Sequence, residues 1–424
     1  MWVGLGVESL WVLLMACGGS TEPLDTGTSG TADTDTDPPT ATDTDTDTEP
    51  VEVESVPGVE VSADGIFAVD QVHTLEITLG EELTAALGAD PYTYVETDVV
   101  FDGRPLDSIG VRLKGKIGSF RSLRQKASFK LDFNRFRDGL TLDGLKKLNV
   151  DNMVQDTAQL HDRIANAAYR AVGIPSPRVG YAWVTVDGEA FGLYSLVEEY
   201  DKVFLKENFA EPEGNLYDGD YWLDPMGVFT MLDFDPETQQ YFDLDVGTDV
   251  ELADIRAVTN IIGATCGTGG FDEAVDEVLD YAWFLRLWAM EVFVGQWDGY
   301  CYGNNNYRVY FDPGRDGRAV LMPWDHGAAF YDMGLNRPVG LLADCCKQEM
   351  GCKQRIYDEV AAVCAELDVD ALTALLDETA ALISPFVVQD PRKELSPEAV
   401  QEGQDAVRDW LAGRCAALER WDGL

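Results

Sequence analysis

The amino-acid composition of the chain changes near residue 57, and this change limits how much of the chain can fold. The segment from Cys17 to Ser55 contains eleven acidic residues, no Lys or Arg, and the run DTDTDPPTATDTDTDTEP. A segment of this kind has no apolar face to bury, and charge repulsion extends it. Asp-rich repeats can also bind calcium, but this run lacks the glycine and hydrophobic spacing of such repeats. We therefore predict a disordered spacer over 18–56 and a folded region from about residue 57.

Residues 1–17 form a separate unit before the spacer. The apolar run 10–16 is too short to cross a bilayer, and it ends in Leu-Met-Ala-Cys. This resembles the end of a bacterial lipoprotein signal peptide, in which Cys17 would be lipidated after cleavage. The protein would then contact the membrane only through this lipid anchor. A plain cleaved signal is the alternative. Either one predicts an exported protein, which is a lipoprotein of the outer or cell-surface membrane or a secreted protein.

The charge balance restricts the partners. The chain has 31 Lys and Arg against 76 Asp and Glu, which gives a net charge of −45. Such an excess of negative charge repels phosphate backbones, so nucleic acid is not an expected ligand. Because 46% of the 424 residues are hydrophobic, the chain can bury at least one large core. This excludes a wholly disordered protein.

Cysteine usage fits an exported protein. Besides Cys17 there are seven cysteines: Cys266, Cys301, Cys345, Cys346, Cys352, Cys364 and Cys415. Clustered cysteines in an exported chain predict disulfides, and an odd number leaves at least one thiol free. Zinc is the weaker interpretation, because none of His73, His161 and His326 has ligand spacing to a cysteine pair.

Alternation of apolar and polar residues predicts strands early in the folded region. The predicted strands cover 72–79, 92–101, 109–113 and 126–133. In the last of them Lys126, Ser128 and Lys130 share one face, and such a face is most often solvated. Two hairpins are also expected, one over 180–198 around Asp187-Gly188 and one over 307–322.

Helices are expected to dominate later in the chain. Helical spacing and end signals predict helices over 156–173 and 274–295 and from residue 369 onward. The acidic stretch 220–250 is predicted to be an irregular insertion or lid. Together these elements predict an α+β protein with two lobes. The β-rich lobe, with one major helix and the insertion, would span 57–270, and the helical lobe with most of the cysteines would span 271–424.

The segment 295–330 holds the residues most suited to chemistry. Asp298 follows a predicted helix, Asn304–Asn306 precede a hairpin strand, and Asp325 follows its partner strand. Two carboxylates and an amide brought together in this way could orient an attacking hydroxyl and hold a magnesium ion for phosphoryl transfer. In turns, however, Asp and Asn more often satisfy backbone groups.

Several segments in order resemble the CotH (spore coat protein H) kinase family, an atypical protein-kinase-like group. They run from about residue 108 to residue 330 and include VRLKGKIGSF, KASFKLDF, DTAQLHDRIANAAYRAVGIPSPRVGYAWVTVDGEAFGLYSLVEEYDKVFL, GNLYDGD, GQWDGYCYGNNNYRVY and PWDHGAAF. The resemblance implies a two-lobed kinase-like fold with a β-rich N-lobe and a helical C-lobe. It also implies use of ATP with Mg²⁺ or Mn²⁺.

The resemblance assigns roles to three residues of segment 295–330. Asp298 would be the catalytic residue that orients or deprotonates the hydroxyl, and Asn306 and Asp325 would hold the metal. Asn305 is a close rival to Asn306, because three asparagines are consecutive. Many relatives have a further aspartate where this chain has Gly327.

The nucleotide would be bound by the earlier segments of the resemblance. The loop 114–119 would cover the phosphates, Lys126 or Lys130 would neutralise them, and Asp162 would hold that lysine in place. Glu198 and Glu199 would lie near the adenine, or they are simply a surface pair at a strand end. For His326 a structural role is favoured over that of a base.

The function implied is an exported kinase that transfers the γ-phosphoryl group of ATP to Ser or Thr of surface or secreted proteins. The alternative is a non-catalytic surface lipoprotein on the same fold, namely a scaffold, adhesin or coat component. A metal-dependent hydrolase is a third and weaker possibility, because the chain lacks histidine ligands and a recognisable nucleophile.

Overall fold

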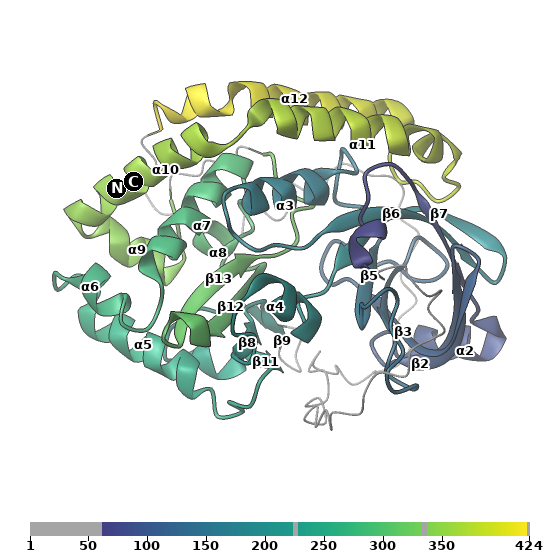
Figure 1. The fold of residues 1–424 in the computed structure, drawn as a ribbon, viewed down its shortest axis with the longest axis horizontal. Helices are drawn as coiled ribbons and strands as arrows, with labels where there is room; N and C mark the ends of the chain where they lie inside the picture. The colour runs from purple at the N-terminus through teal and green to yellow at the C-terminus, as the bar shows by residue number, and fades with distance from the viewer. Residues whose placement is uncertain (1–61, 224–227, 332–336, 422–424) are drawn as a thin grey trace, which may run out of the picture.

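The computed structural model of the chain describes residues 62–223, 228–331 and 337–421. The predicted signal peptide, the spacer 18–56 and the predicted lipidation site Cys17 lie outside these residues. Within them, strands come first and helices predominate later, so the predicted α+β class is confirmed (Figure 1). The division into two lobes at residue 270 stays a prediction.

A closed barrel forms the first half of the described chain. Its strands are β1 (His73–Ile77), β2 (Val95–Phe101), β3 (Arg104–Lys114), β4 (Ser128–Asp132), β5 (Lys147–Asp151), β6 (Val179–Val186) and β7 (Glu189–Glu198). Their order around the barrel is β1-β2-β3-β4-β5-β7-β6, and only the β1–β6 pairing is parallel. The predicted hairpin is present: Asp187 and Gly188 join β6 to β7 with φ of 50° and 80°. Left-handed backbone at both turn residues matches the twist of the paired strands.

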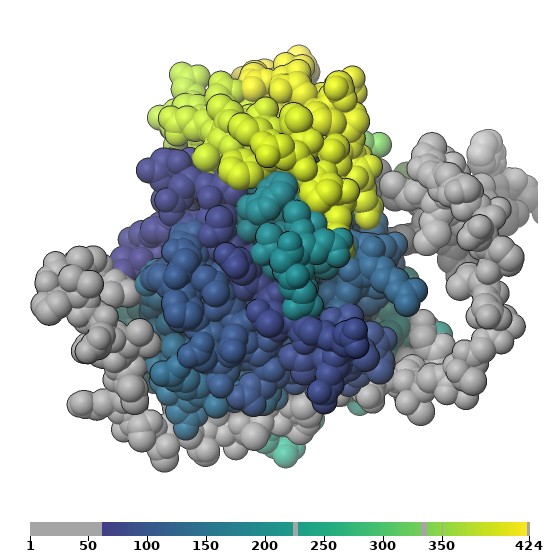
Figure 2. All heavy atoms as spheres, turned by 90° about the vertical axis from the view of Figure 1, so that its right-hand side faces the viewer, coloured from purple at the N-terminus to yellow at the C-terminus, as the bar shows by residue number. Residues whose placement is uncertain are grey.

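Strand β4 is buried on both faces. Phe129 and Leu131 lie in the barrel core, as the alternation predicts. The opposite face is not solvated, however, because Lys126 just before the strand is 2% exposed and Ser128 is inaccessible. The C-terminal part of the chain covers this side of the barrel, as Figure 2 shows for the yellow segment that lies directly on the blue N-terminal half.

A second, four-stranded sheet has the order β11-β8-β12-β13. Its strands are β8 (Asn215–Asp218), β11 (Asp243–Val246), β12 (Tyr307–Asp312) and β13 (Arg318–Pro323). The hairpin expected over 307–322 is β12–β13. The acidic stretch 220–250 is less irregular than expected, since it contributes β11 and the short pair β9 (Trp222–Leu223) and β10 (Phe229–Thr230).

The helices pack around the second sheet and across one side of the barrel. Their bounds are α2 (Gly80–Ala89), α3 (His161–Ala171), α4 (Lys202–Asn208), α5 (Ala253–Thr265), α6 (Phe271–Val275), α7 (Tyr281–Val294), α8 (Tyr300–Gly303), α9 (Leu341–Lys347), α10 (Met350–Glu366), α11 (Val369–Gln389) and α12 (Pro397–Leu418). Helix α7 begins later than the predicted residue 274, because Asp280 caps it by accepting a hydrogen bond from Trp283 N. Helices α11 and α12 run side by side, and α11 also contacts α3 and β7 (Figure 1).

Helix α11 is the one helix of the described residues that is long and apolar enough to cross a membrane by length and composition. Leu372, Leu376, Ile383 and Val387 are nevertheless buried in the folded protein. A helix that packs on a protein core passes the same test, and 28% of the apolar window of α11 is buried in the structure.

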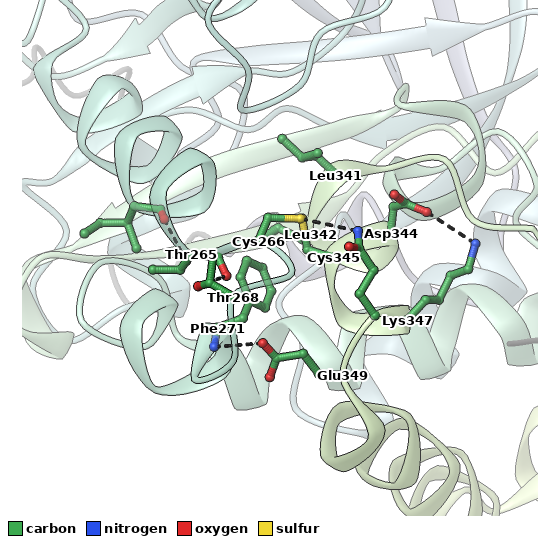
Figure 3. The surroundings of a disulfide bond; sticks show 12 residues. Thr265, Cys266, Thr268, Phe271, Leu341, Leu342, Asp344, Cys345, Lys347 and Glu349 are labelled. Atoms are coloured by element: carbon green, nitrogen blue, oxygen red, sulfur yellow. Dashed lines mark hydrogen bonds and ion pairs between the residues drawn. A yellow bond between two sulfur atoms is a disulfide. The ribbon is translucent and has the colours of Figure 1, made fainter.

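Among the described residues, three disulfides tie the helical region together, and one thiol is free. Cys266 of the α5 C-terminus pairs with Cys345 of α9 (Figure 3), and the other pairs are Cys346–Cys352 and Cys364–Cys415. Cys301 is buried and unpaired. The predictions of disulfides and of a free thiol agree with this arrangement.

Candidate active site

The turn after α7 places Asp298 beside Asn306. Helix α7 ends at Gly295, whose φ of 67° suits a glycine C-cap. Asp298 follows three residues later, and Asn306 stands just before β12 with a left-handed φ of 51°. The Nδ2 atom of Asn306 donates to Oδ2 of Asp298 at 3.0 Å. The structure therefore brings this predicted pair into direct contact.

Asp325 is tied to the same turn through the backbone. It follows β13 with φ of 42°, and its carbonyl accepts a hydrogen bond from Gln296 Nε2 at 2.7 Å. The neighbouring Trp324 donates its backbone N–H to the carbonyl of Asn306 at 2.9 Å. These bonds fix the segment after β13 against the turn that holds Asp298 and Asn306.

Groups from the barrel and from α3 face Asp325 across a small pocket. Its lining consists of Lys114, Asp151, Asp162, Asn166, Pro177, Val197, Trp324 and Asp325. Lys114 Nζ contacts Asp151 Oδ2 at 2.6 Å. Asp162 accepts the backbone N–H of His326 at 2.7 Å, so the start of α3 is joined to the loop after β13. A lysine and three carboxylates therefore share one pocket.

The pKa values of the carboxylates reflect crowding. Burial raises the pKa of Asp298 to about 7, and the nearby Asp325 adds to the rise, while hydrogen bonds from Asn305 and Asn306 oppose it. Burial and the charge of Asp325 also raise the pKa of Asp162 well above its usual value. The side chain of Asp325 reaches solvent, although protein surrounds it closely enough to raise its pKa. The pocket thus holds more negative charge than its lysine balances.

Lys130 takes part in a neighbouring network of charges. Its Nζ lies 3.0 Å from Glu199 Oε2, which also accepts a hydrogen bond from Asn149. Burial alone would raise the pKa of Glu199, but three nearby cations outweigh it and lower the pKa to about 2. These cations are Lys130, Lys147 and Arg308. Arg308 and Lys114 both lie near the ring of Trp324, at 5.2 and 5.7 Å from its centroid, so this network adjoins the pocket.

Two of the predicted nucleotide-binding residues lie elsewhere. The amine of Lys126 is buried against Asp390 just after α11, with Nζ 2.7 Å from Oδ2 and exposures of 2% and 1%. Glu198 is held by Arg178, whose Nε and backbone N–H both contact it. The structure does not bring Lys126 or Glu198 to the pocket, because each is held by an ionic partner elsewhere, Asp390 for Lys126 and the half-buried Arg178 for Glu198.

Lys114, rather than Lys126 or Lys130, lines the pocket. In the register of β3 with β4, Lys114 pairs with Ser128, and Ser128 Oγ lies 3.2 Å from Asp151. From the sequence, Lys114 was expected at the start of the phosphate-covering loop, and neither Asp151 nor Trp324 was predicted as a site residue. The signal for Asp151 was its position as the last residue of the short alternating segment Lys147–Asp151, in which Leu148 and Val150 are the apolar residues.

The loop 115–119 is in contact with the insertion. Lys116 Nζ lies 3.0 Å from Asp220 Oδ2 and 4.7 Å from the centroid of the Tyr221 ring. Asp220 also contributes to the raised pKa of Asp298 and of Asp325. The start of the insertion therefore contacts the loop 115–119, and its charge acts on Asp298 and Asp325. A role as a lid stays a prediction.

His326 has a structural environment. It is inaccessible to solvent, its ring stacks on Tyr169 with centroids 5.1 Å apart, and burial lowers its pKa to about 3. The neutral ring is packed as a structural group, but both of its nitrogens are buried without a hydrogen-bond partner among the described residues, so it is not the satisfied histidine that the sequence favoured.

The oxygen ligands of the site suit a metal ion that arrives with a nucleotide. The described residues contain no group of three or more His, Cys, Asp or Glu side chains able to hold a metal ion on their own. Magnesium in nucleotide sites usually needs only one or two carboxylates, because the phosphates supply other ligands. Asp325 and the amide oxygen of Asn306 are of the right type, since Asn306 uses only its Nδ2 on Asp298. The excess negative charge also fits a divalent cation.

Glu291 braces the turn that follows Asp298. It is buried in α7, and its Oε2 accepts the backbone N–H of Cys301 at 2.9 Å. Burial raises the pKa of Glu291 to about 8, despite hydrogen bonds from Cys301 and Tyr300. The folded protein therefore holds this side chain as a neutral acid at pH 7.

This raised pKa predicts a specific pH dependence of stability. Between about pH 4.5 and 8 the folded state binds a proton at Glu291 that the unfolded state has lost, so the free energy of unfolding falls as pH rises, by at most about 1.4 kcal/mol per pH unit. Glu291→Gln keeps an acceptor for Cys301 N and should remove this contribution. Urea unfolding of both proteins at pH 5, 6, 7 and 8 measures it. Parallel curves for the two proteins would show that Glu291 is ionised in the folded state.

Comparison with known proteins identifies the family. A family model described as CotH kinase protein matches residues 111–418. The chain therefore belongs to the CotH kinase family. The inner spore coat protein H of Bacillus subtilis (strain 168) is 23% identical to it over 318 residues, which cover 70% of this chain and 83% of that relative.

Two solved structures are similar at a lower level. The Helicobacter pylori proinflammatory kinase CtkA has a TM-score of 0.35 and 9% identity, over 72% of this chain and 92% of its own. HipA from Shewanella oneidensis MR-1, in its complex with HipB and operator DNA, has a TM-score of 0.32 and 10% identity, over 82% of this chain and 74% of that chain. Both similarities are distant, and neither bears on the function of this chain.

Proposed function

We propose that the protein is an exported kinase that transfers the γ-phosphoryl group of ATP to Ser or Thr hydroxyls of surface or secreted proteins. Membership of the CotH kinase family supports a kinase-like function. The observation that carries the proposal furthest is that Asp325 shares a pocket with the Lys114–Asp151 pair, while hydrogen bonds tie its segment to the turn in which Asp298 contacts Asn306. Phosphoryl transfer depends on positioning and charge neutralisation, and these are the groups that both tasks require.

Each group has a role in this proposal. Asp298 accepts or orients the hydroxyl proton of the acceptor, and a pKa of about 7 suits a base that works near neutral pH. Lys114 neutralises phosphate charge, and Asp151 holds its amine in position. Asp325 and Asn306 hold Mg²⁺ or Mn²⁺, which when bound would offset the charge on the transferred group.

Loss of the metal-binding carboxylate should remove activity. We expect Asp325→Asn to lower incorporation of labelled γ-phosphate into dephosphorylated casein by at least about 100-fold, because an amide no longer offsets the metal charge. Asp316→Asn is the matched control: Asp316 lies at an exposed turn of the same hairpin with φ of 59°, a conformation that asparagine also tolerates. Equal incorporation by wild type and Asp325→Asn would contradict the proposed role of Asp325.

A second candidate is a non-catalytic surface protein, such as a scaffold, adhesin or coat component. It is favoured by the size of the pocket, which leaves about 10 Å³ open, room for about one water molecule. The kinase proposal requires this pocket to open for ATP. Thermal unfolding separates the two, because a nucleotide at about 100 times its Kd adds about 2.7 kcal/mol of stability. A protein that shows no shift with any nucleotide and metal would fit the non-catalytic role.

A further inference from the structure

A second pocket, outside the proposed active site, is lined by three arginines. It leaves about 190 Å³ open, more than ten times what one ordered water needs. Its lining consists of Asp64, Phe67, Val69, Arg163, Arg170, Arg178, Val179 and Leu375. These residues come from the first described segment, α3, the start of β6 and α11, and Figure 1 shows α3 beneath α11.

Helix α3 places two of the arginines on one face. Arg163 and Arg170 are seven residues apart, two turns of the helix, so their side chains emerge on the same side. Asp162 and Asn166 of the same helix line the active-site pocket. Helix α3 therefore separates two sites of opposite character, one rich in carboxylates and one rich in guanidinium groups.

Two of the three guanidinium groups have no carboxylate partner among the described residues. Arg163 is 4% exposed, its Nη2 donates to the carbonyls of Phe67 and Ala68, and its Nη1 is buried without a hydrogen-bond partner. The guanidinium group also lies over the ring of Tyr181, 5.5 Å from its centroid. Arg170 donates to the carbonyls of Ser176 and Pro177.

Other charges near the pocket do not balance these two arginines. Glu378 of α11 acts on Arg163 only at long range and forms no ion pair with it. Burial lowers the pKa of Arg170 to about 10, an effect that Arg178 and Arg163 reinforce and Glu198 opposes.

Arg178 differs, because carboxylates already surround it. It contacts Glu198, Asp64 at 2.7 Å and Glu207 at 2.6 Å. Arg163 and Arg170 are therefore held by carbonyl groups, and Arg163 also by the Tyr181 ring, but neither forms an ion pair among the described residues. Burying a guanidinium group without a counter-ion is costly, so in a chain with a net charge of −45 two such arginines in one pocket indicate a place for an anion.

We propose that this pocket binds a phosphate group, either free or carried on a protein side chain. A phosphate carries −1.5 to −2 charges near neutral pH, which matches the two unpaired guanidinium groups. Guanidinium groups also bind phosphate oxygens in pairs with defined geometry. The pocket exceeds a single ion in size, which leaves room for the group to which a phosphate is attached. The proposal does not depend on kinase activity.

The site can be tested by calorimetric titration of the purified full chain with inorganic phosphate. Chloride keeps the ionic strength constant throughout the titration. We expect saturable binding that Arg170→Gln weakens at least about tenfold, because one charge-assisted contact is lost. Arg170 makes only carbonyl contacts and is half-buried, so this variant should fold. Arg408→Gln, on the exposed face of α12, is the matched control and should bind like wild type.

Further variants show which of the two pockets binds phosphate, and further ligands show whether the phosphate is free or carried on a protein. Arg163→Gln should behave like Arg170→Gln, and Lys114→Met should still bind phosphate because it alters only the other pocket. If a phosphoserine peptide binds more tightly than inorganic phosphate and its unphosphorylated form does not bind, the natural ligand is a phosphate on a protein. If inorganic phosphate binds more tightly than the phosphoserine peptide, the natural ligand is the free ion. The proposal is overturned if wild type shows no saturable binding, or if Lys114→Met abolishes binding that Arg170→Gln retains.

Discussion

Asp298→Asn is expected to reduce phosphoryl transfer by about 10²–10⁴-fold, the usual contribution of a positioned general base. Asparagine has nearly the same shape, so the contact with Asn306 changes little, but it cannot accept the hydroxyl proton. Transfer of labelled phosphate at saturating ATP, together with the affinity for ATP, measures the effect. We expect kcat to fall with little change in nucleotide binding, because Asp298 acts on the acceptor.

The same control, Asp316→Asn, serves this experiment. A variant Asp298→Asn that retains full activity would show that the hydroxyl needs no base from this position. A variant that loses ATP affinity as well as activity would instead place Asp298 among the metal ligands.

Lys126→Met is expected to destabilise the protein by about 3–5 kcal/mol, because it leaves the carboxylate of Asp390 buried without its cation. Asp390 also accepts the backbone N–H groups of Leu193 and Arg392, so it joins β7 to the segment after α11. Urea unfolding measures the loss. The double variant Lys126→Met/Asp390→Asn should lose less than the sum of its single variants, because the unpaired charge is gone.

Lys114→Met is the matched comparison for this experiment. Lys114 and Asp151 are 19% and 25% exposed, so the same substitution should cost much less stability there. Lys114→Met should instead weaken ATP binding. Lys126→Met should leave ATP binding unchanged, provided that the measurement is made at a temperature where this variant is folded. The opposite pattern would restore Lys126 as the nucleotide lysine.

Much of the local structure was predictable because it depends on neighbouring residues. The Asp187-Gly188 turn needs left-handed backbone that these residues tolerate, so it specified the β6–β7 hairpin. The predicted helix over 156–173 was placed correctly in outline, although α3 begins only at His161. Asp156 still serves its start, since Oδ2 accepts the N–H of His161 at 2.7 Å.

The faces of β4 could not be predicted from its alternation. The pattern KASFKLDF separates polar from apolar residues, but it does not say what covers the polar face. Lys126 forms an ion pair with Asp390, which lies 264 residues later in the chain, and Lys130 forms one with Glu199, just after β7. The choice among Lys114, Lys126 and Lys130 therefore depended on distant partners.

The sequence by itself determined the acidic character of the chain, the order of strands before helices, and the presence of Asp298, Asn306 and Asp325 in one segment. These features follow from composition, periodicity and turn chemistry, which act over a few residues. Only the tertiary structure decided that Lys114 and Asp151 face that segment and that Arg163 and Arg170 meet in a separate pocket. Barrel closure and the packing of α3 bring these groups together, and the ionic partner of a buried charge is set by this packing.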